Sequence, residues 1–199
     1  MLKRPVVFLD RDGTINEEVG YLNHISRLRL IPGAAEGIRR LREAGLAVVI
    51  VTNQSGPARG YFPETLVHEV HRELLRRLAA QGAEVDGIYV CLHAPEARCV
   101  CRKPNPGLIL RAAEELNLDL SRAWVVGDRW VDLELARRVG ARGVLVLTGY
   151  GRGELEYVLP AKGLRPHLVA QDLREAAELI RKDFLSPGSD GSPRPDSGR

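Results

Sequence analysis

Two carboxylates separated by one residue stand directly after a short apolar run near the start of the chain. Residues 6–9 are apolar and partly β-branched, which predicts a strand buried on both faces, and the run ends at Asp10. Asp12 follows, and Gly13 permits a tight turn that can bring both acids toward one point. Ligands bind at this end of the strands in an open α/β sheet. We interpret the pair as a candidate catalytic or metal-binding centre, with two stray acids on a solvated loop as the alternative.

Two further apolar runs, residues 47–51 and 123–126, also end in groups that could do chemistry. Thr52 follows the first run, and Asp128 follows the second. If these strands neighbour the first one, their carboxylates converge, and clustered acids without a counter-charge repel one another. A divalent cation removes that conflict, and hard oxygen ligands suit Mg²⁺ better than zinc. The Thr52 hydroxyl, the N–H groups of the following turn and Lys103 would then bind a phosphate group.

All three cysteines lie in one stretch of the chain, together with a histidine. The set is Cys91, His93, Cys99 and Cys101. Three thiolates and one imidazole in a single loop are typical of a closed, tetrahedral structural zinc site. Because a closed site leaves no position for water, we predict that this zinc stabilises the loop beside Lys103 and takes no part in catalysis. Buried or reactive free thiols are the alternative.

Apolar runs of strand length alternate with segments of helical period along the chain. The expected strands cover residues 6–9, 47–51, 87–90, 123–126, 143–147 and, weakly, 167–169. The expected helices cover residues 34–44, 63–78, 106–116, 129–139 and 172–183, with a short helix after a glycine-rich loop at 149–153. This alternation predicts a doubly wound, mostly parallel α/β sheet of Rossmann-like type with helices on both faces.

The chain is long enough for one domain with a single sizeable core. We assign that domain to residues 1–185, and we predict a disordered tail over 186–199, which is nearly all Ser, Pro, Gly, Asp and Arg. The intervals between the polar strand ends leave no room for a separate cap domain. We therefore expect only loops, at 17–30, 56–62 and 91–104, to cover the site.

Composition is that of an ordinary soluble protein, with 44% apolar and 28% charged residues among 199. The net charge is +3, but the basic residues are dispersed, so we expect neither a nucleic-acid nor a membrane partner. We see no signal peptide or membrane-spanning run, and three cysteines argue against a disulfide framework. We expect a cytoplasmic protein; its oligomeric state stays open, and a monomer is compatible with the sequence.

The polar groups at the strand ends resemble, in order, the four motifs of the haloacid dehalogenase-like phosphatases. The matching stretches are Asp10-x-Asp12-Gly13-Thr14, Thr52-Asn53, Lys103-Pro104 and Gly127-Asp128-x-x-x-Asp132. The resemblance covers residues 5–150 and implies a Mg²⁺-dependent phosphatase that acts through an aspartyl-phosphate.

The resemblance also implies a role for each matching residue. Asp10 would be the nucleophile, and Asp12 the general acid and then base. Phosphate would be bound by Thr52, Asn53 and Lys103. Mg²⁺ would be held by Asp10, the backbone carbonyl of Asp12 and Asp128, with Asp132 behind them.

The cysteine loop narrows the resemblance to one branch of the family. Cys-x-His followed by Cys-x-Cys-Arg-Lys-Pro is similar to the branch that contains D-glycero-D-manno-heptose 1,7-bisphosphate 7-phosphatases and histidinol-phosphate phosphatases. The Gly20-Tyr21 pair and the stretch at 52–60 favour the heptose enzymes, whereas the five residues between His93 and Cys99 also occur in the histidinol branch.

We therefore expect a sugar phosphate as the small-molecule substrate, with histidinol phosphate as the alternative. The candidates to bind a second phosphate are Arg59, Arg102 and Arg129. A zinc-stapled binding module without catalysis is a third interpretation. It would predict a missing nucleophile or acid, and both are present.

Overall fold

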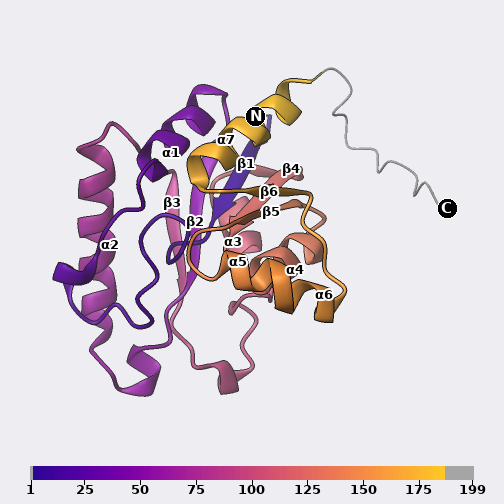
Figure 1. Ribbon diagram of the computed structural model, residues 1–199. Helices are drawn as coiled ribbons and strands as arrows, with labels where there is room; N and C mark the ends of the chain where they lie inside the picture. The colour runs from indigo at the N-terminus through magenta and orange to yellow at the C-terminus, as the bar shows by residue number, and fades with distance from the viewer. Residues whose placement is uncertain (1, 187–199) are drawn as a thin grey trace.

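The computed structural model describes residues 2–186 and shows one six-stranded sheet with helices on both faces (Figure 1). The strands are β1 (Arg4–Leu9), β2 (Ala47–Asn53), β3 (Gly87–Cys91), β4 (Leu118–Gly127), β5 (Arg142–Val146) and β6 (Leu168–Ala170). Neighbouring strands are parallel throughout, in the order β3-β2-β1-β4-β5-β6. Parallel neighbours need crossover connections, which the helices supply. The predicted doubly wound α/β sheet is confirmed.

The helices form two layers, one on each face of the sheet. They are α1 (Ala34–Glu43), α2 (Glu64–Ala79), α3 (Gly107–Glu115), α4 (Trp130–Arg138), α5 (Gly151–Gly153), α6 (Leu159–Lys162) and α7 (Leu173–Leu185). Side chains of α1, α2 and α7 share one core cluster, and those of α3 and α4 share another. Successive β1 side chains alternate between the two cores, since Val7 and Leu9 enter the first and Val6 and Phe8 the second.

β1 lies in the middle of the sheet, where the strand order changes direction. Its last residue, Leu9, pairs with Ile50 of β2 on one side and Val126 of β4 on the other. The residues that follow these three strands therefore meet at one edge of the sheet. In doubly wound sheets the crevice at such a switch point is the usual ligand site.

Three segments differ from the sequence-based expectation. β4 begins at Leu118 rather than at residue 123; its pairing with β1 shifts register between Pro5 and Val7, and the polar residues of its first part hid the strand. The expected glycine-rich loop at 149–153 is helical from Gly151 onward, and helical backbone continues to Lys162. The expected loop at 17–30 contains a short 3-10 turn, Ile25–Arg27. The predicted tail lies, apart from Ser186, outside the described residues.

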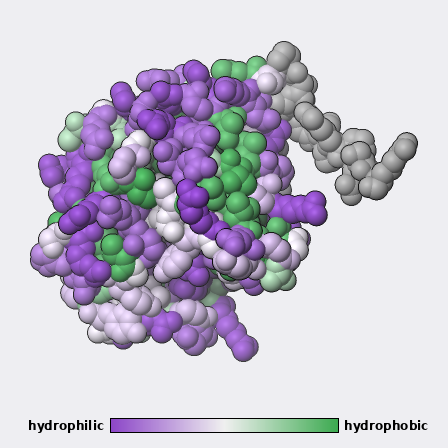
Figure 2. All heavy atoms as spheres, in the orientation of Figure 1, coloured by the Kyte–Doolittle hydropathy of each residue, from purple (hydrophilic) through white to green (hydrophobic). Residues whose placement is uncertain are grey.

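The face of the molecule shown in Figure 2 is mostly hydrophilic, with scattered hydrophobic patches. Amphipathic helices explain this surface, because their apolar sides are used against the sheet and their charged sides face outward. Within residues 2–186, no helix has both the length and the apolar character needed to cross a membrane.

Candidate active site

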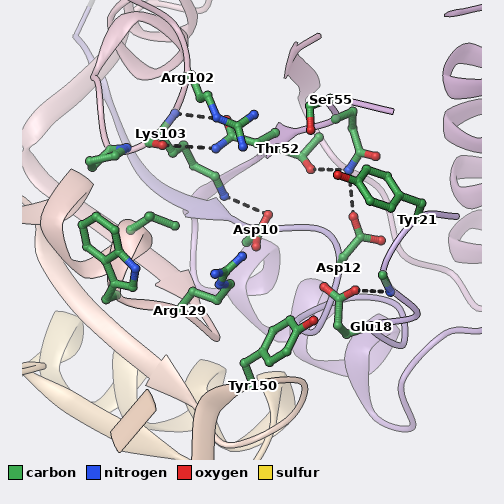
Figure 3. A pocket seen from close by; sticks show the side chains of 16 residues that line it. Asp10, Asp12, Glu18, Tyr21, Thr52, Ser55, Arg102, Lys103, Arg129 and Tyr150 are labelled. Atoms are coloured by element: carbon green, nitrogen blue, oxygen red, sulfur yellow. Dashed lines mark hydrogen bonds and ion pairs between the residues drawn. The ribbon is translucent and has the colours of Figure 1, made fainter. Parts of the chain in front are cut away.

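A pocket of about 450 Å³ opens at the carboxyl edge of the sheet, where β1, β2 and β4 end (Figure 3). Most of the residues predicted to act line it: Asp10, Asp12, Thr52, Asn53, Arg102, Lys103 and Arg129. The predicted loops contribute unequally. Segments 17–30 and 91–104 supply lining residues, whereas none of the lining residues comes from the loop at 56–62. Tyr61 of that loop packs edge-to-face on the lining residue Tyr21, with ring centroids 4.7 Å apart.

A buried lysine lies between two carboxylates at the base of the pocket. The Nζ atom of Lys103 is 2.8 Å from Oδ1 of Asp10 and 2.7 Å from Oδ1 of Asp132. Burial would lower the pKa of Lys103, but the two carboxylates outweigh it and raise that pKa. Burial raises the pKa of Asp10 to about 7 despite the attraction of Lys103. Asp10 is thus a desolvated acid held in one place, as a nucleophile at the end of a rigid strand requires.

Asp128 contributes a third carboxylate, and one of its oxygens has no protein partner. Its Oδ2 accepts the backbone N–H of Tyr150 at 2.8 Å, while its buried Oδ1 accepts no hydrogen bond. Burial, and then the nearby Asp10, raise the pKa of Asp128 to about 8. The chain approaches this group closely, because a side chain on Gly13 or Gly149 would collide with the carboxylate.

These carboxylates fit a hard divalent cation. Ligand oxygens of Asp10, Asp128 and Asp132 all lie within 4.8 Å of one another. Asp132 is already engaged by Lys103 and by the backbone N–H of Arg129 at 3.3 Å, so Asp128 offers the free oxygen. An orphaned buried oxygen beside an ionisable neighbour is the arrangement that Mg²⁺ satisfies.

Asp12 is held by donors from three residues. Arg11, 1% exposed, donates to both carboxylate oxygens, at 2.9 and 2.8 Å from Nη2. Asn16 donates to Oδ1 at 2.8 Å, and Gln54 donates to Oδ2 at 2.7 Å. Burial alone would raise the pKa of Asp12, but the Arg11 charge and the hydrogen bonds from Asn16, Arg11 and Gln54 hold it below its usual range. In the unliganded protein Asp12 is therefore ionised.

The last two residues of β2, Thr52 and Asn53, make different contacts. Thr52 is 1% exposed and its Oγ1 accepts a hydrogen bond from Gln54 at 2.9 Å. The Asn53 carboxamide binds the backbone of Lys103 twice, accepting its N–H at 3.0 Å and donating to its carbonyl at 3.2 Å. Asn53 thus fixes the loop that carries the lysine. Its role as a phosphate ligand stays a prediction.

Two of the three candidate arginines face the pocket. Arg102 lines it and donates to the His93 carbonyl at 3.2 Å, and Arg129 lines it with the guanidinium 5.1 Å from the centre of the Tyr150 ring. Arg59 is not among the lining residues in the described chain, and its guanidinium is 3.8 Å from the exposed Glu96. A contact between Arg59 and a bound substrate stays a prediction.

Sequence reasoning missed several residues of this site. Gln54, Glu18 and Tyr150 line the pocket, and the buried Arg11 donates hydrogen bonds to the carboxylate of Asp12. Gln54 could have been found, because it follows Thr52 by the two-residue period that places strand side chains on the same side. Nothing in the local sequence shows that Arg11 points inward, since a charged residue between two aspartates is typical of an exposed turn.

The cysteine loop forms a second cluster of ligand atoms beside the pocket. The Sγ atom of Cys101 lies 3.1 Å from that of Cys91 and 3.4 Å from that of Cys99, and the Nδ1 atom of His93 is 3.2 Å from Cys101 Sγ. All four residues are candidate ligands within 4.8 Å of one another. Three sulfurs and one nitrogen gathered in this way are a donor set that suits a tetrahedral zinc ion, the site that the sequence predicts.

Two family models match the chain. A model described as haloacid dehalogenase-like hydrolase matches residues 7–85, and one described as "HAD-hyrolase-like" matches residues 100–176. The first match contains β1, β2 and the residues that follow them, and the second contains Lys103 and β4. The two matches together therefore include the residues of the pocket.

Several named relatives resemble the chain over about nine tenths of its length. A D-glycero-D-manno-heptose-1,7-bisphosphate 7-phosphatase of Thermosynechococcus vestitus is 44% identical over 190 residues, covering 90% of this chain and 96% of that protein. One of Pseudomonas putida is 43% identical, covering 88% and 99%. The crystal structure of D,D-heptose 1,7-bisphosphate phosphatase from B. bronchiseptica, complexed with magnesium and phosphate, has a TM-score of 0.82 and 36% identity, covering 90% and 99%.

Proposed function

The chain belongs to the haloacid dehalogenase-like hydrolases, and we propose that it is a Mg²⁺-dependent phosphatase that removes the 7-phosphate of D-glycero-D-manno-heptose 1,7-bisphosphate. The observation that carries this proposal is the buried Asp10 at the base of the pocket, paired with Lys103 at 2.8 Å and with Asp12 two residues away. The curated relatives reported above carry the same activity in their names. A cytoplasmic location, a single domain over residues 1–185 and the lack of a nucleic-acid or membrane partner stay predictions.

In the first step, a carboxylate oxygen of Asp10 attacks the phosphorus. A bond forms between that oxygen and phosphorus, the bond from phosphorus to the substrate's C7 oxygen breaks, and the departing oxygen takes a proton from Asp12. Lys103 and the Thr52 hydroxyl bind the transferred phosphoryl oxygens. The product of this step is an aspartyl-phosphate on Asp10 and the free sugar hydroxyl.

In the second step, Asp12 acts as the base. It takes a proton from water, the water oxygen attacks the aspartyl-phosphate, and the bond from phosphorus to Asp10 breaks. Inorganic phosphate leaves, Asp10 is restored, and Asp12 again carries a proton. The resting pKa of Asp12 is low, so the proton for the first step must arrive with the substrate, whose negative phosphate raises that pKa.

We assign the Mg²⁺ ligands to Asp10, the backbone carbonyl of Asp12 and Asp128. When bound, the ion offsets the negative charge that Asp10 and the phosphoryl group bring together. Asp132 holds Lys103 in reach of Asp10, since its Oδ1 is 2.7 Å from the ammonium group. The chain's own part in the step is thus to hold the nucleophile and the lysine in a fixed geometry.

We assign the second phosphate of the substrate to Arg102 and Arg129 in the pocket wall. Both guanidinium groups can bind phosphate oxygens in pairs, and both lie in a pocket that is open to solvent. Histidinol phosphate carries a cationic amine at its far end, so the two arginines would repel it. The charge at the distal end of the substrate is therefore the property that this site selects.

We also propose one structural zinc ion, held by Cys91, His93, Cys99 and Cys101. All four ligand positions are taken by protein atoms, which leaves none for water or substrate. Its function would be to order the loop that ends in Arg102 and Lys103. It would not take part in phosphoryl transfer.

The test is a side-by-side assay of the two candidate substrates with the Mg²⁺-loaded protein. We expect kcat/KM for the heptose bisphosphate to exceed that for histidinol phosphate by at least about tenfold, or ~1.4 kcal/mol of transition-state binding. Phosphate release from C7 rather than C1 is checked by identifying the monophosphate product. A preference for histidinol phosphate would overturn the substrate assignment and leave the aspartyl-phosphate chemistry in place.

A further inference from the structure

Gln54 lies between two groups that the proposed reaction uses at different moments. Its Nε2 atom is 2.7 Å from Oδ2 of Asp12 and 2.9 Å from Oγ1 of Thr52 (dashed in Figure 3). The side chain lines the pocket, and the residue is 9% exposed. A single amide group is therefore in contact with both the proposed acid–base and the proposed phosphate ligand.

The direction of both hydrogen bonds follows from the chemistry of Asp12. The Oδ2 atom of Asp12 also accepts a hydrogen bond from Nη2 of Arg11 at 2.8 Å, so the Gln54 atom that faces it is the NH₂ group, which has two hydrogens. One hydrogen goes to Asp12 and the other to Thr52. Because Thr52 accepts through Oγ1, its single hydroxyl proton points away from Gln54, and Thr52 lines the pocket. The hydroxyl is thereby set as a donor, as a phosphate oxygen requires.

Gln54 also differs from the other donors to Asp12 in where it lies. Arg11 and Asn16 are 1% and 0% exposed and hold the carboxylate from the protein interior. Of these three donors, Gln54 lines the pocket. It therefore fixes the Oδ2 atom on the side from which a substrate oxygen must approach.

We propose that Gln54 is a positioning residue that sets the Thr52 hydroxyl as a phosphate donor and orients Asp12 for proton transfer. This inference rests on the proposed phosphatase function. The two parts of the proposal can be tested separately. The role toward Thr52 concerns phosphate binding, and the role toward Asp12 concerns protonation of the leaving oxygen. A residue that merely fills space would affect neither one specifically.

The experiment uses Gln54→Met, which keeps the length of the side chain and removes both donors, in the Mg²⁺-loaded protein. Two quantities are measured: the inhibition constant of inorganic phosphate, and the ratio of kcat/KM for the heptose bisphosphate to that for p-nitrophenyl phosphate, whose leaving group needs no proton. We expect the inhibition constant to rise at least about fivefold and the ratio to fall at least about fivefold. Gln81→Met, at an exposed position, is the matched control and should change neither quantity.

Double-mutant cycles identify the route of each effect. In a Thr52→Val background, Gln54→Met should change the phosphate inhibition constant by less than about twofold, and in an Asp12→Asn background it should change the substrate ratio by less than about twofold. Losses that are equal and additive in every background would overturn the inference. If Gln54→Met does not fold, Gln54→Asn tests the same point, because its amide is too short to reach both partners. A parent protein that hydrolyses neither substrate would instead refute the proposed function.

Discussion

The pocket and the cysteine loop lie side by side, yet they are built in opposite ways. The pocket brings together residues that are far apart in the chain: Asp10 and Asp128 directly follow β1 and β4, Asp132 lies in α4, and Lys103 contacts both Asp10 and Asp132. The cysteine loop takes its four candidate ligands from residues 91–101, where Cys91 is the last residue of β3 and the short turn Pro95–Ala97 is the regular structure described in the rest of the segment. Strands and a helix of the sheet layers position the first, whereas the second gathers its candidate ligands within eleven residues around which we propose a zinc ion.

The two regions differ in what each proposed metal ion would contribute to them. Protein contacts already position the carboxylates, so Mg²⁺ adds charge rather than shape. In the loop, the thiol sulfurs lie 3.1 to 3.6 Å apart and Val100 is 79% exposed, so the proposed zinc ion would join residues of an exposed loop to Cys91 at the end of β3. Loss of Mg²⁺ should therefore abolish chemistry and keep the fold, whereas loss of zinc should loosen structure and spare the chemical step.

Asp10→Asn should have the largest effect on activity, and it tests the pocket, the first of the two regions compared. The substitution removes the nucleophilic charge and keeps the shape, so turnover should fall by at least about a thousandfold. Folding should be retained, because burial makes the ionised Asp10 costly and Lys103 keeps its contact with Asp132 at 2.7 Å. The measurements are kcat and the thermal unfolding temperature.

Asp12→Asn is the companion variant, and its loss should be greater for the heptose bisphosphate than for p-nitrophenyl phosphate. Such a dependence on the leaving group separates acid catalysis from simple damage to the site. Activity of Asp10→Asn within about tenfold of the parent would show that Asp10 is not the nucleophile.

Removal of zinc tests the cysteine loop, the second of the two regions compared. Stripping the ion with a chelator should lower the unfolding temperature by at least about 5 °C, which for a chain of this size is on the order of 2 kcal/mol. Hydrogen exchange should become faster in residues 91–104 and stay unchanged in β1. Metal analysis of protein purified without added metal should find one zinc per chain.

Cys99→Ser provides the matched variant, since it removes one ligand without a chelator that could also bind Mg²⁺. It should reproduce the loss of stability, and Mg²⁺ should still be required for turnover. Full activity of a metal-free sample on addition of zinc alone would contradict the separation of roles between the two metals.

We expect Mg²⁺ to change the unfolding temperature by an amount that depends on pH. This difference should be smaller than the effect of zinc removal, and it should arise from carboxyl groups of the pocket. Burial raises the pKa of Asp10 to about 7 and that of Asp128 to about 8 in the metal-free protein. A carboxyl group whose pKa is higher in the folded than in the unfolded state binds more protons when folded, so the free energy of unfolding falls as the pH rises from about 4 to about 8. Mg²⁺ favours the ionised forms and should therefore raise the unfolding temperature more at pH 8 than at pH 5.5.

Calorimetry of zinc-loaded protein with and without Mg²⁺ measures this difference directly. Asp128→Asn should reduce it, because the variant removes one of the two raised carboxyl groups. A Mg²⁺ effect of the same size at both pH values would show that these carboxylates do not bind the ion.

Much of the fold could be predicted because its strands are short apolar runs bounded by polar turns. The prediction failed where that contrast is weak: the first part of β4 contains Asp119 and Ser121, and the helical stretch after Gly151 begins with glycines. The adjacency of β1 and β4 could not be derived from local pattern, since strand order depends on tertiary packing. The family resemblance implied it indirectly, because it assigned Asp10 and Asp128 to one Mg²⁺ ion.

The candidate site divides in the same way. Residues that end strands, such as Asp10 and Asp128, could be predicted because the backbone alone places them at the edge of the sheet. Residues whose side chains turn inward from a loop could not: Arg11 is buried against Asp12 and also contacts Nε2 of His71 at 3.1 Å. His71 itself shares the apolar face of α2 with Val70 and Leu74, so helical period could have predicted its burial.

Arg102→Ala gives the smallest expected effect and tests the one point where the two regions meet. Arg102 follows directly on Cys101, donates to the His93 carbonyl at 3.2 Å and lines the pocket. Its removal should raise KM for the heptose bisphosphate about three- to tenfold and leave kcat nearly unchanged, since a ligand of the distal phosphate is lost. The activity toward histidinol phosphate should stay the same or rise, because one of the two charges that repel its amine is gone. Arg98→Ala, in the same loop, is the control for a general change of charge. Equal losses on both substrates would show that Arg102 acts on the transferred phosphate, and the cysteine loop would then belong to the catalytic site rather than to the part that selects the substrate.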